Sequence, residues 1–347
     1  MAASLRLPIK PPYPPMEALS SEKIPAGEGW LYEPKWDGFR CIAYKDGQNV
    51  FLQSKNGLPL GRYFPEVVEH VKSIAATKFV LDGELVVRTG KQLSFEELQL
   101  RLHPAESRVR KLAHEHPATF LVFDLLVDER GKALVDLPLR ERRPKLEAFA
   151  RRFMRVEGIR LSKATKQSRV VAGWFETVGG ALDGIIAKRL DAEYCSGERS
   201  GAQKIKKLRT ADCVVGGFRY ASTGKVIGSL LLGLYDRNGL LHHVGFTSGL
   251  SADERKALVP KLKPLIKPPG FTGRAPGGPS RWSTERTDQW EPLVPKLVVE
   301  VTFDHVTDER FRHGTRLLRW RPDKSPQQCT MEQLDVVASA SLLKLSS

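Results

Sequence analysis

The sequence predicts an α+β protein built from two domains, residues 1–210 and 211–347. Its length of 347 residues is more than one hydrophobic core usually organises. In the first part, apolar runs typical of buried strands alternate with helical patterns. In the second part, short strand patterns follow one another across glycine-rich turns, with one helical pattern among them. This second part is predicted to be a small β-barrel of the OB type.

Three strand signals open the first domain. Residues 40–57, RCIAYKDGQNVFLQSKNG, have the pattern of a β-hairpin with Asp46 and Gly47 at its turn. The apolar runs KFVLDGELVV (78–87) and ATFLVFDLLV (118–127) are rich in β-branched and aromatic residues. Each of these runs predicts a buried strand.

Two helices are predicted in the same domain. SFEELQLRLH (94–103) has helical spacing, with Ser94 as its N-cap and Glu97 three residues later. The strongly basic stretch at residues 138–153 also has helical spacing, and Pro144 is expected to divide or kink that helix.

The second domain begins after a basic run and reads as strands joined by turns. One helix is predicted at SADERKALVPKLKPL (251–265), and a long Pro/Gly-rich loop at residues 268–282. The strand patterns are CVVGGFRY (213–220), GSLLLGLYD (228–236), HHVGFTS (242–248) and LVVEVTFD (297–304).

Charge and cysteine content limit the kind of protein. The formal net charge is +15, from 55 Lys and Arg against 40 Asp and Glu, which points to a polyanionic partner and leaves a solvated basic surface as an equally open alternative. The four cysteines lie far apart, so neither a zinc site nor a disulfide framework is predicted. Without a signal-peptide pattern or a long apolar run, we expect a soluble cytoplasmic protein that does not span a membrane.

The stretch YEPKWDGFR (32–40) places a lysine, Lys35, in an unusual setting. A protonated lysine is a poor nucleophile, so a reactive one needs desolvation or neighbouring cations. Pro34 and Trp36 could exclude water from one side, and Arg40 could return to bind an anionic oxygen. On these residues alone, a surface lysine at a strand end, followed by an Asp-Gly turn, is the favoured interpretation.

Six motifs, taken together, favour a reactive Lys35 over a surface lysine. KWDGFR (35–40) fits the KxDGxR signature of the covalent nucleotidyltransferases, which are ATP-dependent DNA ligases, RNA ligases and mRNA capping enzymes. The sequence resembles the minimal bacterial ATP-dependent DNA ligases, most of all the stand-alone LigC type linked to repair and end joining. The five further motifs occur in order over nearly the whole chain: LDGELVV (81–87), FLVFDLLV (120–127), DGIIAK (183–188), KIKK (204–207) and RWRPDKSP (319–326).

The resemblance implies an adenylation (nucleotidyltransferase) domain of antiparallel sheets with helices, followed by an OB-fold β-barrel. It also implies three phosphoryl transfers. Lys35 would attack the α-phosphate of ATP, expel pyrophosphate and form lysyl-AMP. AMP would then pass to the 5′-phosphate of a DNA nick, and the 3′-hydroxyl would displace it. Because each step concentrates negative charge on phosphate oxygens, cations and Mg²⁺ or Mn²⁺ are implied at the site.

The resemblance assigns roles around Lys35. Glu33 would accept a hydrogen bond from the adenine amino group, and Arg40 would bind the ribose or phosphate edge. Phe123 would stack on the adenine. Glu84 would contact the ribose hydroxyls and lie near a metal ion. An exposed strand acid stays the alternative for Glu33, and a core phenylalanine for Phe123.

Two positions depart from the family pattern. Asp183 stands where Glu is common, and its shorter carboxylate is a candidate metal ligand together with Glu84. Lys55 lies at a turn where arginine is frequent, so a phosphate contact there would be weaker. Lys204 and Lys206 are predicted to alternate along a strand and to hold the α-phosphate between them. Surface solvation is the alternative for these two lysines.

The last motif and the substrate complete the resemblance. In the family, the terminal motif orients the pyrophosphate in the first step, and the candidates are Arg319, Arg321, Asp323 and Lys324. The implied substrate is nicked duplex DNA, bound by a monomer. The Ku end-binding protein and a separate repair polymerase are suggested partners by analogy.

Four other classes of protein share part of this pattern. An mRNA guanylyltransferase would share KxDGxR, but Glu33 and the RPDKSP tail favour a ligase that uses ATP. An RNA ligase usually lacks the OB domain with the terminal motif, and an NAD-dependent ligase carries a nicotinamide-capturing domain and zinc modules. A non-catalytic nucleic-acid-binding scaffold would be expected to have lost Lys35, Glu84 or the KIKK pair.

Overall fold

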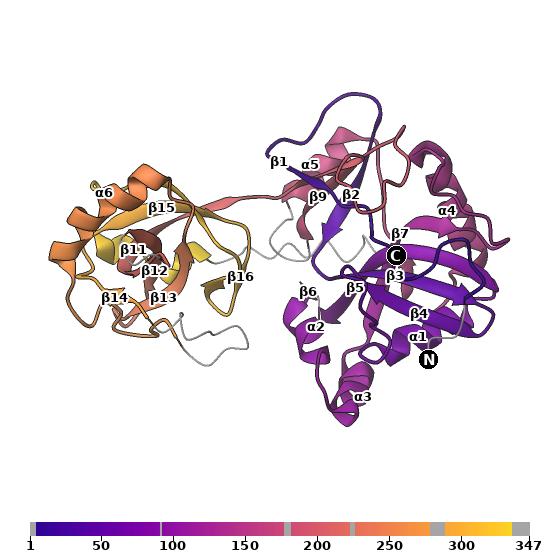
Figure 1. Cartoon of the computed structure of the whole chain (residues 1–347), viewed down its shortest axis with the longest axis horizontal. Coiled ribbons are helices and arrows are strands. Elements are labelled where there is room, and N and C mark those ends of the chain that lie inside the picture. Colours follow the sequence, from indigo (N-terminus) through magenta and orange to yellow (C-terminus); the bar gives the residue numbers. More distant parts are fainter. Residues whose placement is uncertain (1–4, 91, 177–181, 223–225, 278–288, 335–347) are drawn as a thin grey trace. The chain divides into compact units, whose positions relative to one another are not determined.

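A computed structural model describes residues 5–90, 92–176, 182–222, 226–277 and 289–334. These residues form two compact units, and the chain passes from the first to the second between Lys207 and Leu208 (Figure 1). The predicted border between an adenylation domain and an OB-fold domain, between residues 210 and 211, stays a prediction. Each unit is described below by itself.

The first unit contains two sheets. The larger has the strand order β4-β3-β5-β7-β8, with β6 paired to β5, and the smaller has the order β1-β10-β9-β2. The larger sheet consists of β3 (Phe39–Asp46), β4 (Asn49–Ser54), β5 (Lys78–Thr89), β6 (Gln92–Leu93), β7 (Ala118–Val127) and β8 (Ile159–Leu161). The smaller sheet consists of β1 (Leu19–Ser21), β2 (Trp30–Trp36), β9 (Leu182–Arg189) and β10 (Ala202–Ile205). The helices are α1 (Pro65–Ser73), α2 (Phe95–Arg101), α3 (Glu106–Glu115), α4 (Leu139–Phe153) and α5 (Ser168–Glu176).

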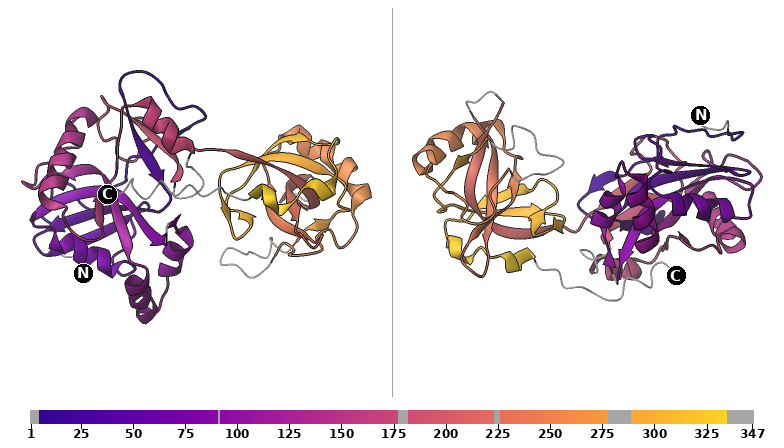
Figure 2. Two further views of the ribbon diagram at one scale, coloured as in Figure 1. Left: turned by 180° about the vertical axis from the view of Figure 1, so that it is seen from behind. Right: turned by 90° about the horizontal axis from the view of Figure 1, so that it is seen from below.

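Strand β5 shows how the larger sheet distributes its side chains. Alternate residues of a strand point to opposite faces. Phe79, Leu81 and Leu85 enter the core that α1, α2 and α4 cover. Asp82 and Glu84 lie on the other face and line a pocket against the smaller sheet. One face of β5 therefore stabilises the fold, and the other supplies charged groups. Figures 1 and 2 show the ribbon of this unit, coloured from indigo to magenta, from three sides.

The predicted hairpin and the predicted cap are confirmed. Strands β3 and β4 pair in antiparallel register with Asp46 opposite Asn49. Gly47 in the turn has a φ of 59°, a left-handed value that glycine adopts without strain. Ser94 Oγ accepts a hydrogen bond of 3.3 Å from the backbone N–H of Glu97 at the start of α2.

The predicted division at Pro144 is wrong, because α4 runs without interruption from Leu139 to Phe153. A proline inside a helix removes one backbone hydrogen bond. The two preceding residues compensate for that loss with buried contacts. Arg142 pairs with Asp124 of β7 at 3.0 Å, and Arg143 bonds to the Ser162 carbonyl at 2.8 Å. These contacts fix α4 against the larger sheet directly before the proline.

The second unit is built on an antiparallel sheet of order β13-β12-β11-β15-β18, with β14 paired to β11. Its strands are β11 (Arg209–Tyr220), β12 (Ile227–Tyr235), β13 (Leu241–Thr247), β14 (Glu291–Pro292), β15 (Val298–Phe303) and β18 (Arg316–Trp320). A separate hairpin pairs β16 (Val306–Thr307) with β17 (Arg310–Phe311). The helical segments are α6 (Ala252–Leu262) and the short 3₁₀ turns Lys263–Leu265, Pro326–Gln328 and Met331–Leu334.

The two edges of this sheet approach each other at one end. Thr247 at the end of β13 donates its hydroxyl to the Thr315 carbonyl at 2.9 Å, and the Thr315 N–H donates to the Phe246 carbonyl at 3.2 Å. Contact between the first and last strands of a curved sheet is what a small barrel requires. The α+β class and the OB-type architecture expected of this unit agree with its sheet order.

Two further findings concern the chain as described. No helix among the described residues is long and apolar enough to span a membrane. The four cysteines are free thiols, of which Cys41, Cys213 and Cys329 are buried and Cys195 is partly exposed.

Candidate active site

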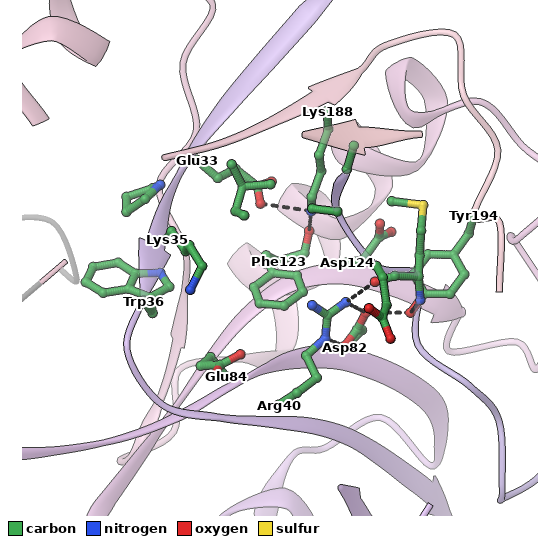
Figure 3. A pocket seen from close by; sticks show the side chains of 16 residues that line it. Glu33, Lys35, Trp36, Arg40, Asp82, Glu84, Phe123, Asp124, Lys188 and Tyr194 are labelled. Carbon is green, nitrogen blue, oxygen red and sulfur yellow. Dashed lines mark hydrogen bonds and ion pairs between the residues drawn. The ribbon is translucent and has the colours of Figure 1, made fainter. Parts of the chain in front are cut away.

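A pocket of the first unit lies between its two sheets (Figure 3). Strands β2 and β9 supply one wall, and strands β3, β5 and β7 supply the other. Among the lining residues are five that the sequence singled out, namely Glu33, Lys35, Arg40, Glu84 and Phe123. Strands far apart along the chain therefore bring the motif residues to one place.

Lys35 lies near the end of β2, opposite Gly184 of β9. Its Nζ donates a hydrogen bond to Asp183 Oδ2, and Lys206 Nζ lies 3.3 Å from the same oxygen. The Lys35 side chain is 22% exposed and that of Asp183 is 9% exposed. A side chain at Gly184 would place its Cβ only 2.1 Å from the Ile205 carbonyl oxygen. Glycine at this position therefore lets β9 lie close to the segment that carries Lys206.

The Asp-Gly step after Lys35 is fixed by a second close approach. A Cβ at Gly38 would lie 2.2 Å from the Leu85 carbonyl oxygen, which no side chain tolerates. Because Gly38 has none, β3 can begin directly against β5, with Arg40 opposite Glu84. The turn thereby carries the chain from the nucleophile candidate on one sheet to Arg40 on the other.

Arg40 is held by a buried carboxylate. Its Nε and Nη2 donate to the two oxygens of Asp82 at 2.7 and 2.6 Å, and its guanidinium lies 4.5 Å from the centre of the Phe123 ring. The hydroxyl of Tyr194 donates to Asp82 at 2.6 Å. Asp82 is fully buried, so these three donors compensate for its desolvation (Figure 3). Phe123 itself is 8% exposed and lines the pocket.

Glu33 is also buried and paired. Lys188 Nζ lies 2.8 Å from Glu33 Oε2, and Arg143 Nη1 lies 3.3 Å from Glu33 Oε1. The Lys188 ammonium also lies 4.7 Å from the centre of the Phe123 ring. An exposed strand acid is therefore the wrong description of Glu33, which is 2% exposed. Its predicted contact with adenine stays a prediction.

Glu84 has an altered protonation equilibrium. Withdrawal from water raises its pKa to about 7, while the charges of Arg40 and Lys35 act in the opposite direction. The carboxyl group can therefore exchange a proton near neutral pH.

The remaining predicted lysines of the first unit lie around this centre. Lys204 is in β10, where burial and the nearby ammonium of Lys35 lower its pKa. Lys206 directly follows the last residue of that strand. Of the two lysines predicted to alternate along one strand, only Lys204 therefore lies within it. Lys55, just beyond β4, pairs with the pocket residue Glu17 at 3.1 Å.

The terminal motif belongs to the second unit. Asp212 of β11 receives Arg321 Nη1 at 2.8 Å and Lys324 Nζ at 2.6 Å. Arg321 also pairs with Asp323 at 2.8 Å, and Arg319 pairs with Glu300 of β15 at 2.6 Å. All four predicted residues thus lie at one side of the sheet formed by β11, β15 and β18.

A divalent metal is compatible with the donors present. Among the described residues, no three Asp, Glu, His or Cys side chains form a cluster that could hold a metal by themselves. Glu84 and Asp183 both lie close to Lys35, as shown by their electrostatic and hydrogen-bonded contacts with it. Mg²⁺ at nucleotide sites commonly uses one or two carboxylates and takes its other ligands from phosphates and water.

Sequence reasoning missed four residues of this site. Asp82 and Lys188 lie inside the motifs LDGELVV and DGIIAK but received no role. A charged residue within a buried-strand pattern needs a partner, and that signal could have identified both. Tyr194 and Arg143 contact the pocket from distant segments, and no pattern along the chain announces them.

Family models divide the chain in the same order as the structure. The ATP dependent DNA ligase domain matches residues 15–206, and the ATP dependent DNA ligase C terminal region matches residues 223–324. The first match covers more than half of the chain and contains every residue discussed for the pocket.

Curated relatives match over nearly the full length. DNA ligase C1 of Mycolicibacterium smegmatis is 43% identical over 95% of each chain, and DNA ligase C of Mycobacterium tuberculosis is 40% identical over 97% of this chain and 98% of that protein. A solved structure of a Lig E DNA ligase aligns with a TM-score of 0.55 over 88% of this chain and 100% of that chain. At 19% identity this last likeness shows the fold alone. The chain belongs to the ATP-dependent DNA ligase family.

Proposed function

We propose that this ligase seals 5′-phosphate/3′-hydroxyl nicks in duplex DNA through a lysyl-AMP intermediate on Lys35. Residues 1–210 would act as the adenylation domain and residues 211–347 as the OB-fold domain. One observation carries the proposal. The pocket between the two sheets joins Lys35 to an aromatic face, a partly buried arginine and two carboxylates.

The first step requires a neutral amine. Lys35 Nζ would attack the α-phosphorus of ATP, forming a P–N bond while the bond to the β-phosphate oxygen breaks and pyrophosphate leaves. An ammonium that donates to Asp183 has no lone pair to offer. Asp183 Oδ2 is already within hydrogen-bond distance of Nζ, so it is the nearest group that can accept the departing proton.

The nucleotide would be held by the groups that surround Lys35. Phe123 offers a flat apolar face for the adenine, and Glu33 lies beside it with its carboxylate turned toward Lys188. Arg40 and Glu84 lie opposite each other on neighbouring strands, and they would contact the ribose and phosphate edge. Lys204, Lys206 and Lys55 would add positive charge near the phosphate oxygens, on which negative charge accumulates in the transition state.

A bound Mg²⁺ or Mn²⁺ would neutralise charge on the phosphate oxygens, and Glu84 and Asp183 are the side chains that would hold it. In the same step, Arg319, Arg321, Asp323 and Lys324 would orient the pyrophosphate.

Two transfers would follow. AMP would pass from Lys35 to the 5′-phosphate of the nick, and the 3′-hydroxyl would then attack that phosphate and release AMP. The net charge of +15 supports a substrate with a continuous phosphate backbone.

A covalent labelling experiment tests the proposal. The protein is incubated with Mg²⁺ and ATP or GTP labelled at the α-phosphate, denatured and separated by electrophoresis. We expect a label from ATP that survives denaturation and is lost in Lys35→Ala. Labelled protein should transfer AMP to a nicked duplex and then yield sealed product. No label, a label only from GTP, or a label retained by Lys35→Ala would contradict the proposal.

We further propose that the protein acts as a monomer in repair or end joining, in cooperation with a Ku-type end-binding protein and a separate repair polymerase. This rests on the resemblance to ligases of the LigC type. Nick and end joining are measured with and without purified Ku. Unchanged rates and unchanged binding to DNA ends would count against that partner.

A further inference from the structure

The second unit contains a buried histidine whose hydrogen bonding is incomplete. His243 of β13 is 3% exposed. Its Nδ1 lies 3.2 Å from Arg310 Nη2, and because a guanidinium can only donate, Nδ1 must be the acceptor. The proton of the neutral ring then resides on Nε2. That buried N–H has no hydrogen-bond partner in the part of the chain that the structure describes.

Arg274 adds further donors of the same kind. Its backbone carbonyl accepts from the N–H of His243 at 2.8 Å, which ties the two residues together. Nε and Nη2 of Arg274 are buried and make no hydrogen bond with the described residues. The guanidinium makes a long 3.4 Å bond from Nη1 to the Asp308 carbonyl and a 3.7 Å ion pair with Glu309. Glu309 is 70% exposed, so it is a poorly fixed counter-ion.

The pKa shifts of His243 and Arg310 agree with a surplus of hydrogen-bond donors and positive charge at this place. Burial and the charges of Arg310, Arg219 and Arg274 lower the pKa of His243 to about 3. Burial and the charge of Arg274 also lower the pKa of Arg310. Positive charge is therefore concentrated at this place.

The backbone here is held in an uncommon conformation. Asp308 and Glu309, which connect β16 to β17, have φ values of 49° and 59°. Positive φ at both central residues is the geometry that a two-residue type I′ hairpin turn requires. This turn places Arg310 at the histidine and the Asp308 carbonyl at Arg274.

A set of buried donors without acceptors is complementary to an oxyanion. Native proteins leave few buried polar groups unsatisfied, and an absent ion or ligand is a regular explanation. A neutral histidine N–H together with arginine N–H groups suits phosphate, because phosphate offers several acceptor oxygens and a delocalised negative charge. The Arg274 side chain is 35% exposed although its Nε and Nη2 atoms are buried, so the cluster lies directly beneath the surface and these side chains would have to move for a ligand to reach them.

We propose that His243, Arg274 and Arg310 form a phosphate-binding site on the second unit, and that it receives a backbone phosphate of the DNA duplex. The assignment to DNA rests on the function proposed above. A free phosphate or pyrophosphate ion shares the chemistry, and the experiment separates the two sources.

The first measurement is the affinity of the full-length protein for a nicked duplex, by fluorescence anisotropy, over about 50 to 200 mM salt. Arg274→Gln should weaken binding about 5- to 20-fold and lower the slope of log K against log salt by about 1. Arg274→Lys keeps the charge and should recover part of the affinity. Arg237→Gln removes an equal charge from the exposed β12–β13 turn of the same unit and is the matched control.

Outcomes on DNA are unambiguous once folding is verified by thermal unfolding. Equal losses in Arg274→Gln and Arg237→Gln would overturn the site, because a general loss of charge would explain both. If Arg274→Gln does not fold, Arg310→Gln is measured in the same way. Covalent labelling of Lys35 by ATP labelled at the α-phosphate is measured separately in the wild-type protein. Absent labelling contradicts the proposed function, whereas normal labelling with unchanged DNA affinity contradicts only this site.

The second measurement identifies the source of the anion. Inorganic phosphate is titrated into the protein while the ring signals of His243 are followed by NMR, with His243→Gln for assignment. We expect the His243 signals to shift with phosphate concentration and to saturate with weak affinity. This shift should be absent in Arg274→Gln, and nicked DNA should suppress it by competing for the site. Tight phosphate binding that DNA does not affect would overturn the DNA assignment. No response to phosphate or to DNA would overturn the site altogether.

Discussion

Lys35 and Asp183 form an ion pair between neighbouring strands, β2 and β9, at the wall of the pocket between the two sheets. Asp183 also receives Lys206, so one carboxylate serves two cations. This arrangement keeps Lys35 in place. In the mechanism proposed above, the attack of Lys35 on ATP therefore requires the ion pair to open.

Asp183→Asn should reduce formation of the lysyl-AMP adduct by about 100-fold or more, because asparagine cannot accept the proton of Lys35. Asp183→Glu keeps the carboxylate and should lose less than about 10-fold. Rates are measured from labelled protein at saturating ATP. Asp191→Asn, at an exposed position paired with Arg189, is the matched control. A similar loss in both asparagine variants would rule out a special role of Asp183.

Asp82→Asn should destabilise the first unit by about 3–5 kcal/mol, since it leaves the partly buried Arg40 without its counter-charge. Tyr194→Phe removes one hydrogen bond to the same carboxylate and should cost about 1–3 kcal/mol. Both values are obtained from chemical denaturation followed by circular dichroism. If Asp82→Asn costs no more than Tyr194→Phe, the carboxylate is not the organising group of this network.

Asp212→Asn should lower the melting temperature of the second unit by about 2–8 °C, because Arg321 and Lys324 lose the carboxylate that they share. Asp323 also pairs with Arg321 but is 63% exposed, so Asp323→Asn should change the melting temperature little. Differential scanning calorimetry of the full-length protein measures both. Equal shifts would show that burial of Asp212 is unimportant.

The pH dependence of stability should contain a contribution from His243. Its folded-state pKa of about 3 lies below the ordinary value near 6.5, so the unfolded chain binds a proton first as the pH falls. The stabilising effect of the neutral ring is complete above pH 6.5 and is lost by about 1.4 kcal/mol per pH unit below it.

His243→Gln should therefore reduce the stability difference between pH 7 and pH 5 by about 2 kcal/mol. Urea unfolding at both pH values checks this expectation. His114→Gln, an exposed histidine of α3, should leave the difference unchanged. If the wild-type protein and His243→Gln lose the same stability, His243 is not buried as a neutral ring.

The sequence predicted the parts of the site that are local in character. Lys35, Gly38 and Arg40 are close along the chain, and the Asp-Gly turn between two strands follows from residue type alone. The strand patterns also predicted which segments are buried. In β5 the alternation that buries Leu81 also directs Glu84 to the pocket.

What could not be predicted depends on contacts between distant segments. Arg143 looked like one charge in a basic helix, but it is 7% exposed and bonds to Glu33, 110 residues away. The same buried contacts allow α4 to pass through Pro144, against the local preference of proline. Local patterns carry no information about which buried acid will meet which cation, and this limits what can be inferred for such pairs.

The distribution of thiols gives the protein a natural reporter. Cys195 is the one cysteine that solvent reaches, and it follows Tyr194, whose hydroxyl contacts Asp82 at the pocket. A maleimide dye should therefore attach at a single position beside the nucleotide site without any engineered cysteine. Its fluorescence would follow nucleotide entry in real time, in a chain whose other thiols are shielded by the two hydrophobic cores.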